Sequence, residues 1–541
     1  MQFLVLLKEL QQKQGDDAVF EAAYTRGATD LEYFATRYFP HYCEYPFNKF
    51  HRDCFKTFKY GAKAQKNVRA APRGCAKSTF KTLIEVIHSI CYGDEDYIVI
   101  ISNTDIQAKG KLKDIRNELL TNELLIADFR ISFPSGKPAE TAFIVNSQPF
   151  DRNHQTMLSA FGSGAEIRGI RFREKRPSKI ICDDIEHSEK VFNEELREKD
   201  KDYYYQVVSK IGNRFTNIDF VGTILHRDSL LIKLLNNPAY EGKTYKSIIS
   251  WSDREDLWAK WREIYNQIED PDRKDKAHLF YMEHKDEMLK NTKVLWPEYE
   301  DYEFLMQEMV EIGRRAFMKE KQNEPLGAED KVFEKIHWYR EVDEGFLVLD
   351  TGKIITKEDL ISSYGVIDPS TGQTKAKKGR LGDFSCLLTG YEDRFGRCLV
   401  HRDWTKRAAP SKYIKEIFLQ HEIWDYNKFG VETNLYRNLL LPNIIQERDR
   451  IEKETKKLVK IPFYDIENTD NKEKRIFTLE PKVEHGWILF NEALSKTFMN
   501  MLIEFPHADH DDGPDALEML YGLIHKRYKP AAVSLNTMGN R

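Results

Sequence analysis

The 541-residue sequence has few cysteines and no long apolar run. Its seven cysteines are scattered and form no C-x-x-C pair; they stand at positions 43, 54, 75, 91, 182, 386 and 398. This scatter argues against a zinc site and a disulfide framework, and it favours a reducing cytoplasm. No stretch approaches about 18 consecutive apolar residues, so we expect no transmembrane helix. The apolar N-terminus lacks the basic segment and cleavage site of an export signal, and we expect an amphipathic helix there.

Neither sign of charge is in excess. The chain has 83 Lys and Arg against 87 Asp and Glu, a formal net charge of -4. This balance neither supports nor excludes nucleic-acid binding, because basic residues can be local and acidic ones can gather at metal sites. The length is too great for one core, and two or three domains are the natural expectation. The apolar and aromatic content excludes wholesale disorder.

Apolar runs that alternate with helical patterns predict an α/β fold. Runs at 96–102, 179–184 and 218–225 have the continuous apolar character of buried parallel strands. A second α/β block begins near Ser363, with strands of antiparallel appearance, and the charged helical stretch between the blocks resembles a linking subdomain. The predicted organisation is a helical segment and a first α/β domain over 1–250, a helical linker over 251–345, a second α/β domain with a mixed sheet over 346–528, and a mobile tail over 529–541.

The stretch from Val68 to Thr79 predicts a phosphate-binding loop between a strand and a helix. The usual pattern is G-x-x-x-x-G-K-[ST], and here alanine stands at both glycine positions, Ala71 and Ala76. The chemistry survives this change, since backbone N–H groups at a helix start still point at phosphates. Lys77 reaches the β- and γ-phosphates of ATP and the Ser78 hydroxyl ligates Mg²⁺ in such loops. The predicted nucleotide contacts are Arg73, Gly74, Cys75, Ala76, Lys77, Ser78 and Thr79.

Acidic residues at the end of a later strand complete the predicted ATP site. Asp183 ends an apolar strand, the place from which an acid holds Mg²⁺ through water, and the next acid polarises the attacking water. Asp184 occupies that second place, with Glu186 as the alternative. Arg73 is either an arginine finger acting in cis or a solvated loop residue. Thr223, at the end of the next strand, either senses the γ-phosphate, helped by His226, or serves ordinary turn chemistry.

Three separated acidic positions in the second block predict a two-metal nuclease. Asp368, Glu432 and the Asp511–Asp512 pair each follow a strand or begin a helix. Carboxylates brought together from distant strands build two-metal phosphodiesterase sites, and the β-β-β-α-β-α order suggests a ribonuclease H-like domain. Asp383 and Asp515 are extra candidate acids, and Lys375, Lys377, Lys378 and Arg380 form a basic loop that would lie beside DNA.

A second basic run, in the first block, comprises Arg168, Arg171, Arg173, Lys175 and Arg176. It either grips a phosphate backbone or is a solvated face.

Taken in order, these pieces resemble the large terminase subunit of tailed bacteriophages over roughly residues 40–525. The resemblance is carried by Ala71-Pro-Arg-Gly-Cys-Ala-Lys-Ser, Glu166-Ile-Arg-Gly-Ile-Arg, Arg176-Pro-Ser-Lys-Ile-Ile-Cys-Asp-Asp, Val294-Leu-Trp-Pro-Glu, Gly365-Val-Ile-Asp-Pro, Gly430-Val-Glu and His510-Asp-Asp. It implies an N-terminal ATPase that translocates double-stranded DNA and a C-terminal metal nuclease that cuts concatemers. By it, Asp183 belongs to Walker B, Thr223 to the coupling motif, and Asp368, Glu432 and Asp511 or Asp512 are metal ligands.

The same resemblance implies the surroundings of the protein. Its cofactors are ATP and Mg²⁺, with Mn²⁺ as an alternative in the nuclease site. Its partners are a portal protein, a small terminase subunit and further copies in a ring, expected as a pentamer, docked at the procapsid in the host cytoplasm and absent from the mature virion; no membrane is expected. The competing hypotheses are a helicase- or repair-type ATPase fused to a nuclease, a transposase or resolvase, and a non-catalytic capsid or scaffold protein.

Overall fold

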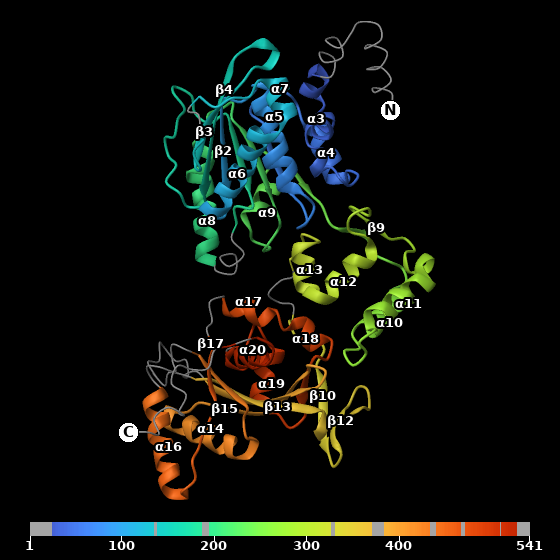
Figure 1. Ribbon diagram of the computed structural model, residues 1–541, viewed down its shortest axis with the longest axis vertical. Coiled ribbons are helices and arrows are strands. Elements are labelled where there is room, and N and C mark those ends of the chain that lie inside the picture. Colours follow the sequence, from blue (N-terminus) through green and yellow to red (C-terminus); the bar gives the residue numbers. More distant parts are fainter. Residues whose placement is uncertain are drawn as a thin grey trace. The chain divides into compact units, whose positions relative to one another are not determined.

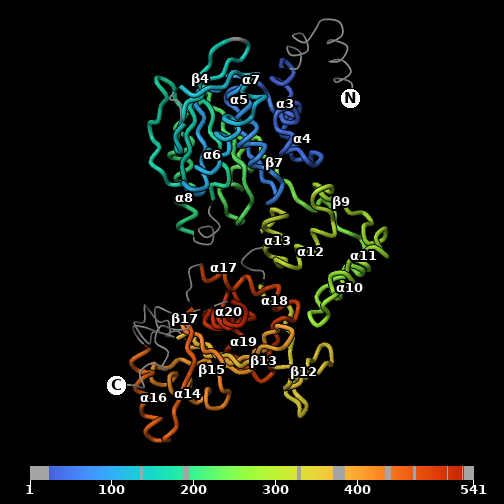
Figure 2. Tube along the Cα trace, in the orientation of Figure 1, coloured from blue at the N-terminus to red at the C-terminus, as the bar shows by residue number. Residues whose placement is uncertain are grey.

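The computed structural model describes residues 24–134, 138–186, 194–325, 331–369, 384–432, 440–466, 471–508, 510–526 and 528. Two compact units divide the chain: unit 1 comprises 1–255, 286–309 and 315–327, and unit 2 comprises 256–285, 310–314 and 328–541. Both are drawn in Figure 1 and traced in Figure 2. None of the described helices combines the length and apolar character needed to cross a membrane. The predicted tail, 529–541, lies outside the described residues.

The stretch predicted as a separate linker, 251–345, is shared between the two units. Some of its side chains form contacts within unit 1 and others within unit 2, in agreement with the division of the chain. Asn323 accepts a hydrogen bond from the Ile224 N–H of unit 1 at 2.8 Å. Glu269, by contrast, pairs with Lys353 and Arg397 of unit 2, each at 2.7 Å. The sequence pattern located these helices but did not show which unit each belongs to.

Unit 1 is built on a sheet that has seven strands within the described residues, in the order β3-β4-β2-β5-β6-β1-β7. Neighbouring strands pair in parallel except β3 with β4. The strands are β1 (Lys66–Ala70), β2 (Tyr97–Ser102), β3 (Ala142–Ser147), β4 (His154–Gly162), β5 (Lys179–Asp183), β6 (Asn217–Gly222) and β7 (Glu241–Thr244). Strands β2, β5 and β6 are buried along their whole length, as continuous apolar runs require. The predicted α/β fold is confirmed.

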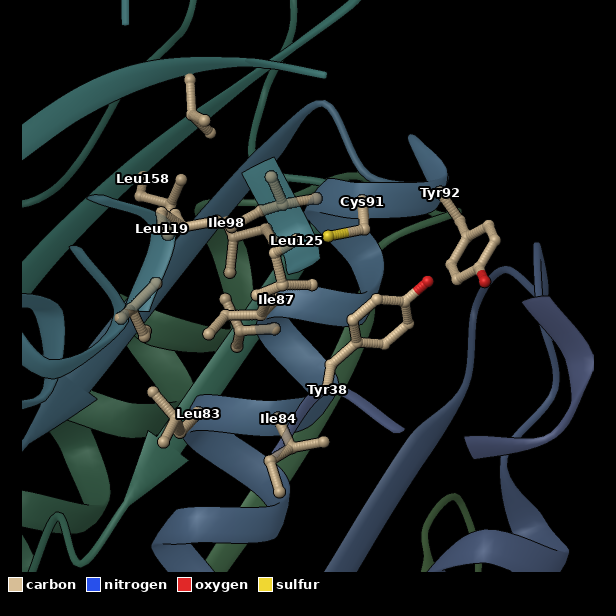
Figure 3. Packing of buried hydrophobic residues seen from close by; sticks show 14 of the residues in the cluster. Tyr38, Leu83, Ile84, Ile87, Cys91, Tyr92, Ile98, Leu119, Leu125 and Leu158 are labelled. Atoms are coloured by element: carbon tan, nitrogen blue, oxygen red, sulfur yellow. The ribbon is translucent and has the colours of Figure 1, made fainter. Parts of the chain in front are cut away.

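Helices cover both faces of this sheet. They are α3 (Leu31–Tyr38), α4 (Lys49–Thr57), α5 (Glu85–Tyr92), α6 (Asp105–Thr121), α7 (Glu123–Phe129), α8 (Glu194–Gln206) and α9 (Leu230–Leu235). On one face, Ile87 and Cys91 of α5 lie among Leu119, Leu125 and Leu158 in an apolar core, which Figure 3 shows from close by. On the other face α8 and α9 pack through a second apolar cluster. This three-layer packing fixes the strand ends where the site lies.

The helices and short strands that follow β7 are shared between the units. They are β8 (Ile248–Ser250), α10 (Glu255–Tyr265), α11 (Arg273–Met288), β9 (Lys293–Val294), α12 (Tyr302–Ile312) and α13 (Arg314–Glu320). Trp258 and Trp261 of α10 are fully buried and lie edge to face with ring centroids 5.4 Å apart. Large apolar side chains at this spacing therefore serve packing here.

Unit 2 is built on a mixed sheet with nine strands in the described residues, in the order β12-β11-β10-β18-β15-β14-β13-β16-β17. The strands are β10 (His337–Val342), β11 (Gly345–Val348), β12 (Ile354–Thr356), β13 (Leu360–Asp368), β14 (Ser385–Asp393), β15 (Cys398–Lys406), β16 (Lys428–Glu432), β17 (Phe463–Ile466) and β18 (Ile488–Asn491). Strands β13, β14 and β15 pair antiparallel, whereas β16 runs parallel to β13. The predicted mixed sheet is confirmed.

Helices also cover both faces of the second sheet. They are α14 (Pro410–Trp424), α16 (Leu441–Thr455), α17 (Lys472–Phe477), α18 (Glu480–Glu484), α19 (Lys496–Ile503) and α20 (Asp512–His525). Helix α20 crosses β13 and β14. It approaches so closely that a Cβ at Gly390 would lie 2.8 Å from Leu520 Cδ2, so a larger residue there would force the Leu520 side chain to shift. This packing sets the N-terminus of α20 beside the ends of the strands.

Candidate nucleotide and metal sites

The predicted phosphate loop connects β1 to a helix whose first turns are a π-helix, η2 (Thr79–Ile84), followed by α5. Two residues hold left-handed backbone: Gly74 with φ of 90° and Ala76 with φ of 54°. A Cβ at Gly74 would lie 2.8 Å from Glu300 Oε1. Gly74 is thus the loop position that needs glycine, while the usual second glycine is replaced by an alanine that bears its left-handed conformation at a cost of about 1–2 kcal/mol.

Asp183 is the centre of the first site. Its carboxylate is fully buried and accepts hydrogen bonds from Ser78 Oγ at 3.0 Å and Thr82 Oγ1 at 2.6 Å. The Lys111 ammonium, from α6, lies 2.8 Å from the same carboxylate. Ser78 and Asp183, each predicted as a Mg²⁺ residue, therefore lie in contact although they are 105 residues apart in sequence. Thr82 and Lys111 were not predicted: Thr82 lies one turn after Ser78, and Lys111 belongs to α6, which packs on β2 and β4.

Lys77, Thr223 and Asp184 meet at the adjoining strand ends. Lys77 Nζ donates to Thr223 Oγ1 at 3.1 Å and lies 3.6 Å from Asp184 Oδ2. Thr223 in turn donates to the Ala71 carbonyl at 3.2 Å. Strand β6 stands between β1 and β5 in the sheet. That order places Thr223 between the loop and the acids.

The two alternative acids have different surroundings. Glu186 accepts hydrogen bonds at both carboxylate oxygens, from the Leu230 and Leu231 N–H groups at 2.8 and 3.0 Å. It therefore binds the N-terminus of α9. Burial raises the pKa of Glu186 to about 7, against the lowering effect of these two N–H groups. Asp184 faces Lys77 with 43% of its side chain exposed, in a left-handed conformation of φ 50°. The geometry favours Asp184 as the acid that reaches a water.

Arg73 is an exposed residue near the acids, whereas His226 belongs to a turn. The Arg73 side chain is 68% exposed, and its Nε lies 3.0 Å from Glu320. Its charge lowers the pKa of Asp184, although burial outweighs this and raises it overall. Arg73 is thus near the acids yet reachable from outside. His226 Nδ1 accepts from the Asp228 N–H at 3.0 Å, so turn chemistry accounts for it.

His51 supports the loop and was not predicted as a site residue. Its Nδ1 accepts from the Asn48 N–H at 3.3 Å, and Nε2 contacts the Cys75 carbonyl at 3.0 Å. Burial lowers the pKa of His51 to about 4, so the ring is neutral and Nε2–H is the donor. The ring also packs 4.2 Å from Phe80. His51 and Phe80 therefore pack together in support of the loop. An asparagine cap with His three residues later was the local signal.

The basic run at 168–176 lies before β5, at the opposite end of that strand from Asp183. Lys175 pairs with Asp96 at 2.8 Å and Arg176 donates to the Lys210 carbonyl at 3.3 Å. Arg168, Arg171 and Arg173 are exposed. A groove of about 540 Å³ is lined in part by Arg171, Lys175 and Arg176. The run is an exposed basic face at the opposite end of β5 from Asp183, and its grip on a phosphate backbone stays a prediction.

The predicted acids of the second block come together in unit 2. Asp368 ends β13 and Glu432 ends the adjacent parallel strand β16. Asp511 and Asp512 stand at the start of α20, where the helix dipole favours acids. Burial raises the pKa of Asp368 to about 8, and the neighbouring charges of Asp515, Asp512 and Glu432 add to the rise. Asp368 therefore lies within electrostatic range of Glu432, Asp512 and Asp515. Asp383 and the basic loop at 375–380 lie outside the described residues.

The cluster fits a divalent cation chemically, but a lysine stands within it. Across the residues that the structure describes, no three His, Cys, Asp or Glu side chains are already grouped to hold a metal ion. Asp368 Oδ2 is buried and accepts no hydrogen bond from the described residues. The Lys472 ammonium lies 3.8 Å from this oxygen. An all-oxygen carboxylate set suits Mg²⁺ or Mn²⁺. Asp515 is also held by Arg475 at 2.8 Å, which makes it a supporting residue.

Solved structures of large terminases align with this chain over most of its length. The large terminase of a thermophilic bacteriophage aligns at 10% identity with a TM-score of 0.47, covering 88% of this chain and 99% of that one. The large terminase of bacteriophage HK97 aligns at 10% identity and a TM-score of 0.31, covering 92% and 99%. The human cytomegalovirus terminase nuclease domain aligns at 12% identity and a TM-score of 0.24, covering 31% and 87%. No family model and no curated protein matches the sequence. At these values the likeness does not itself assign an activity.

Proposed function

We propose that unit 1 binds and hydrolyses ATP. The observation that carries this proposal is the convergence on Asp183 of the Ser78 hydroxyl, from the loop helix, and of Lys111, with Lys77 and Asp184 beside it. A hydroxyl, a buried acid and a loop lysine at one edge of a parallel sheet form the arrangement that holds a nucleoside triphosphate with Mg²⁺. Bound Mg²⁺ supplies positive charge to the phosphates, and Ser78 and Asp183 are the residues that would hold it.

The other residues of the site have separable roles in this proposal. Lys77 exchanges its contacts with Thr223 and Asp184 for the phosphates. Its departure leaves Asp184 as the general base that orients and polarises a water. Thr223 contacts both Lys77 and the Ala71 carbonyl, so it relays the state of the phosphates to the loop. Arg73 supplies an exposed guanidinium that stabilises charge developing on the transferred phosphoryl group.

Unit 2 is proposed as a metal-dependent DNA endonuclease. Asp368, Glu432 and Asp512, with Asp511 beside it, would hold the cation, and the raised pKa of Asp368 marks a carboxyl that needs a positive partner to ionise. Such ions activate water and neutralise the scissile phosphate. Arg475 holds Asp515 and Glu518 in place behind the cluster.

Two substitutions in the full-length chain test both halves. Lys77→Ala is expected to abolish ATP hydrolysis and leave Mn²⁺-dependent plasmid cleavage largely intact, and Asp368→Ala is expected to do the reverse. The matched controls are Lys109→Ala on the exposed side of α6 and Glu422→Ala on the exposed side of α14, which should change neither activity. Loss of both activities in a folded single variant, or cleavage by Asp368→Ala at the parental rate, would overturn the proposal.

The combined activities suit the large subunit of a viral DNA-packaging motor, and the motif order that resembles terminases supports this role. In it, the protein hydrolyses ATP to translocate double-stranded DNA into a procapsid and cuts concatemers. A ring of copies, proposed as a pentamer, would work with a portal protein and a small terminase subunit in the host cytoplasm. ATP turnover should then rise with double-stranded DNA. Stimulation by single-stranded DNA alone, with strand separation, would favour the helicase or repair alternative.

A further inference from the structure

Lys472 is the cation that the structure places among the carboxylates of unit 2, and no role was predicted for it. It opens α17, and its ammonium lies 2.9 Å from Asp511 Oδ1, 3.1 Å from Asp515 Oδ2 and 3.8 Å from Asp368 Oδ2. These acids come from β13 and from the start of α20, so the lysine bridges separate elements.

The energetics favour a charged lysine here. The ammonium faces the carboxylates of Asp511, Asp515 and Asp368, all within 3.8 Å. Close carboxylates repel one another strongly when buried, and a cation between them removes that penalty. Asp515 has a second cationic partner in Arg475, whereas Asp368 Oδ2 accepts no hydrogen bond from any described residue. Without the lysine, Asp515 would therefore keep a cationic partner, whereas Asp368 Oδ2 would have none among the described residues.

We propose that Lys472 is the resident counter-cation of this cluster, which a divalent ion must displace from Asp368 and Asp511 while the ammonium stays on Asp515. The inference rests on the proposed metal site. It predicts that the lysine weakens divalent-ion binding and keeps the metal-free site folded. A positive charge about 4 Å from a divalent ion opposes binding even in a watery dielectric, by at least about tenfold in affinity.

The test is Mn²⁺ affinity, measured on the full-length chain without nucleotide through the loss of the free-ion EPR signal. Lys472→Met should bind Mn²⁺ at least about tenfold more tightly than the parent. Lys472→Arg, which keeps the charge, should remain near the parental affinity. Lys457→Met, which removes a charge from an exposed position of the same unit, is the matched control and should not change it. Lys472→Gln replaces the methionine variant if that one does not fold.

Asp368→Asn locates the effect. Adding it to Lys472→Met should remove the gain in affinity, because the ion site that the lysine occupies is then lost. Unchanged or weaker Mn²⁺ binding in both neutral variants overturns the counter-cation role, as does a gain of the same size in Lys472→Arg. These readouts are independent of cleavage. A parent that binds Mn²⁺ through Asp368 but never cuts DNA would refute the nuclease and leave this inference standing.

Discussion

The choice between Asp184 and Glu186 as the ATPase carboxylate leads to opposite outcomes for two conservative substitutions. Glu186→Gln converts one acceptor oxygen into an amide that faces a backbone N–H of α9, at a cost of about 1–3 kcal/mol. A loss near 2 kcal/mol lowers the melting temperature by about 4–8 °C in a domain of 150–250 residues.

Asp184→Asn should behave in the opposite way. Its side chain is 43% exposed and contacts Lys77 at 3.6 Å, so its ion pair contributes at most about 1 kcal/mol to folding. Loss of a general base, however, slows turnover by about 10²–10⁴-fold. We therefore expect a stable, inactive Asp184→Asn and a less stable, active Glu186→Gln.

The assay pairs thermal unfolding with ATP turnover at 20 °C, for the parent and both variants. Measurements at pH 8 keep Glu186 mostly ionised, because burial raises its pKa to about 7. At 20 °C a destabilised Glu186→Gln remains folded, so turnover reports chemistry alone. A folded Glu186→Gln without turnover, together with a working Asp184→Asn, would refute the reasoning and assign the base to Glu186.

Three other outcomes are expected. Arg73→Ala should keep its melting temperature and its ATP binding, since the guanidinium is exposed, but lose about 10³-fold in turnover; near-normal turnover would assign the finger to another arginine. Because His51 stays neutral in the folded state, the unfolded state binds an extra proton between pH 6.5 and 4, and the free energy of unfolding should fall by about 3 kcal/mol over that range. Denaturation measured at several pH values should show a smaller fall for His51→Phe. Burial raises the pKa of Asp219, but Lys81 and Lys179 outweigh burial and lower that pKa to about 2. The stability that the Asp219 carboxylate contributes is therefore present above pH 4 and lost towards pH 2, and acid denaturation of Asp219→Asn should lack that loss.

Much of the candidate site could be found along the chain because its signals are local. A continuous apolar run ending in acids predicts a buried strand with polar residues at the sheet edge, and Asp183 and Asp368 stand at such ends. A small-residue turn before Lys77 and Ser78 predicts a helix start that binds anions. The spacing of apolar residues and the small residues of a turn determine such features within about ten residues, so these features do not depend on the rest of the fold.

Tertiary packing decided the assignments that local patterns left open. Glu186 and Asp184 are nearly adjacent in sequence, but α9 lies where its N–H groups take the Glu186 carboxylate. Lys111 and Lys472 carry no motif, and each meets an acid cluster only because a helix packs beside the end of a strand. The sequence by itself determined which strands end in functional acids. The order of strands in the sheets and the seating of helices on them decided which cations face those acids, because ion pairs between distant segments depend on positions in space and not on spacing along the chain.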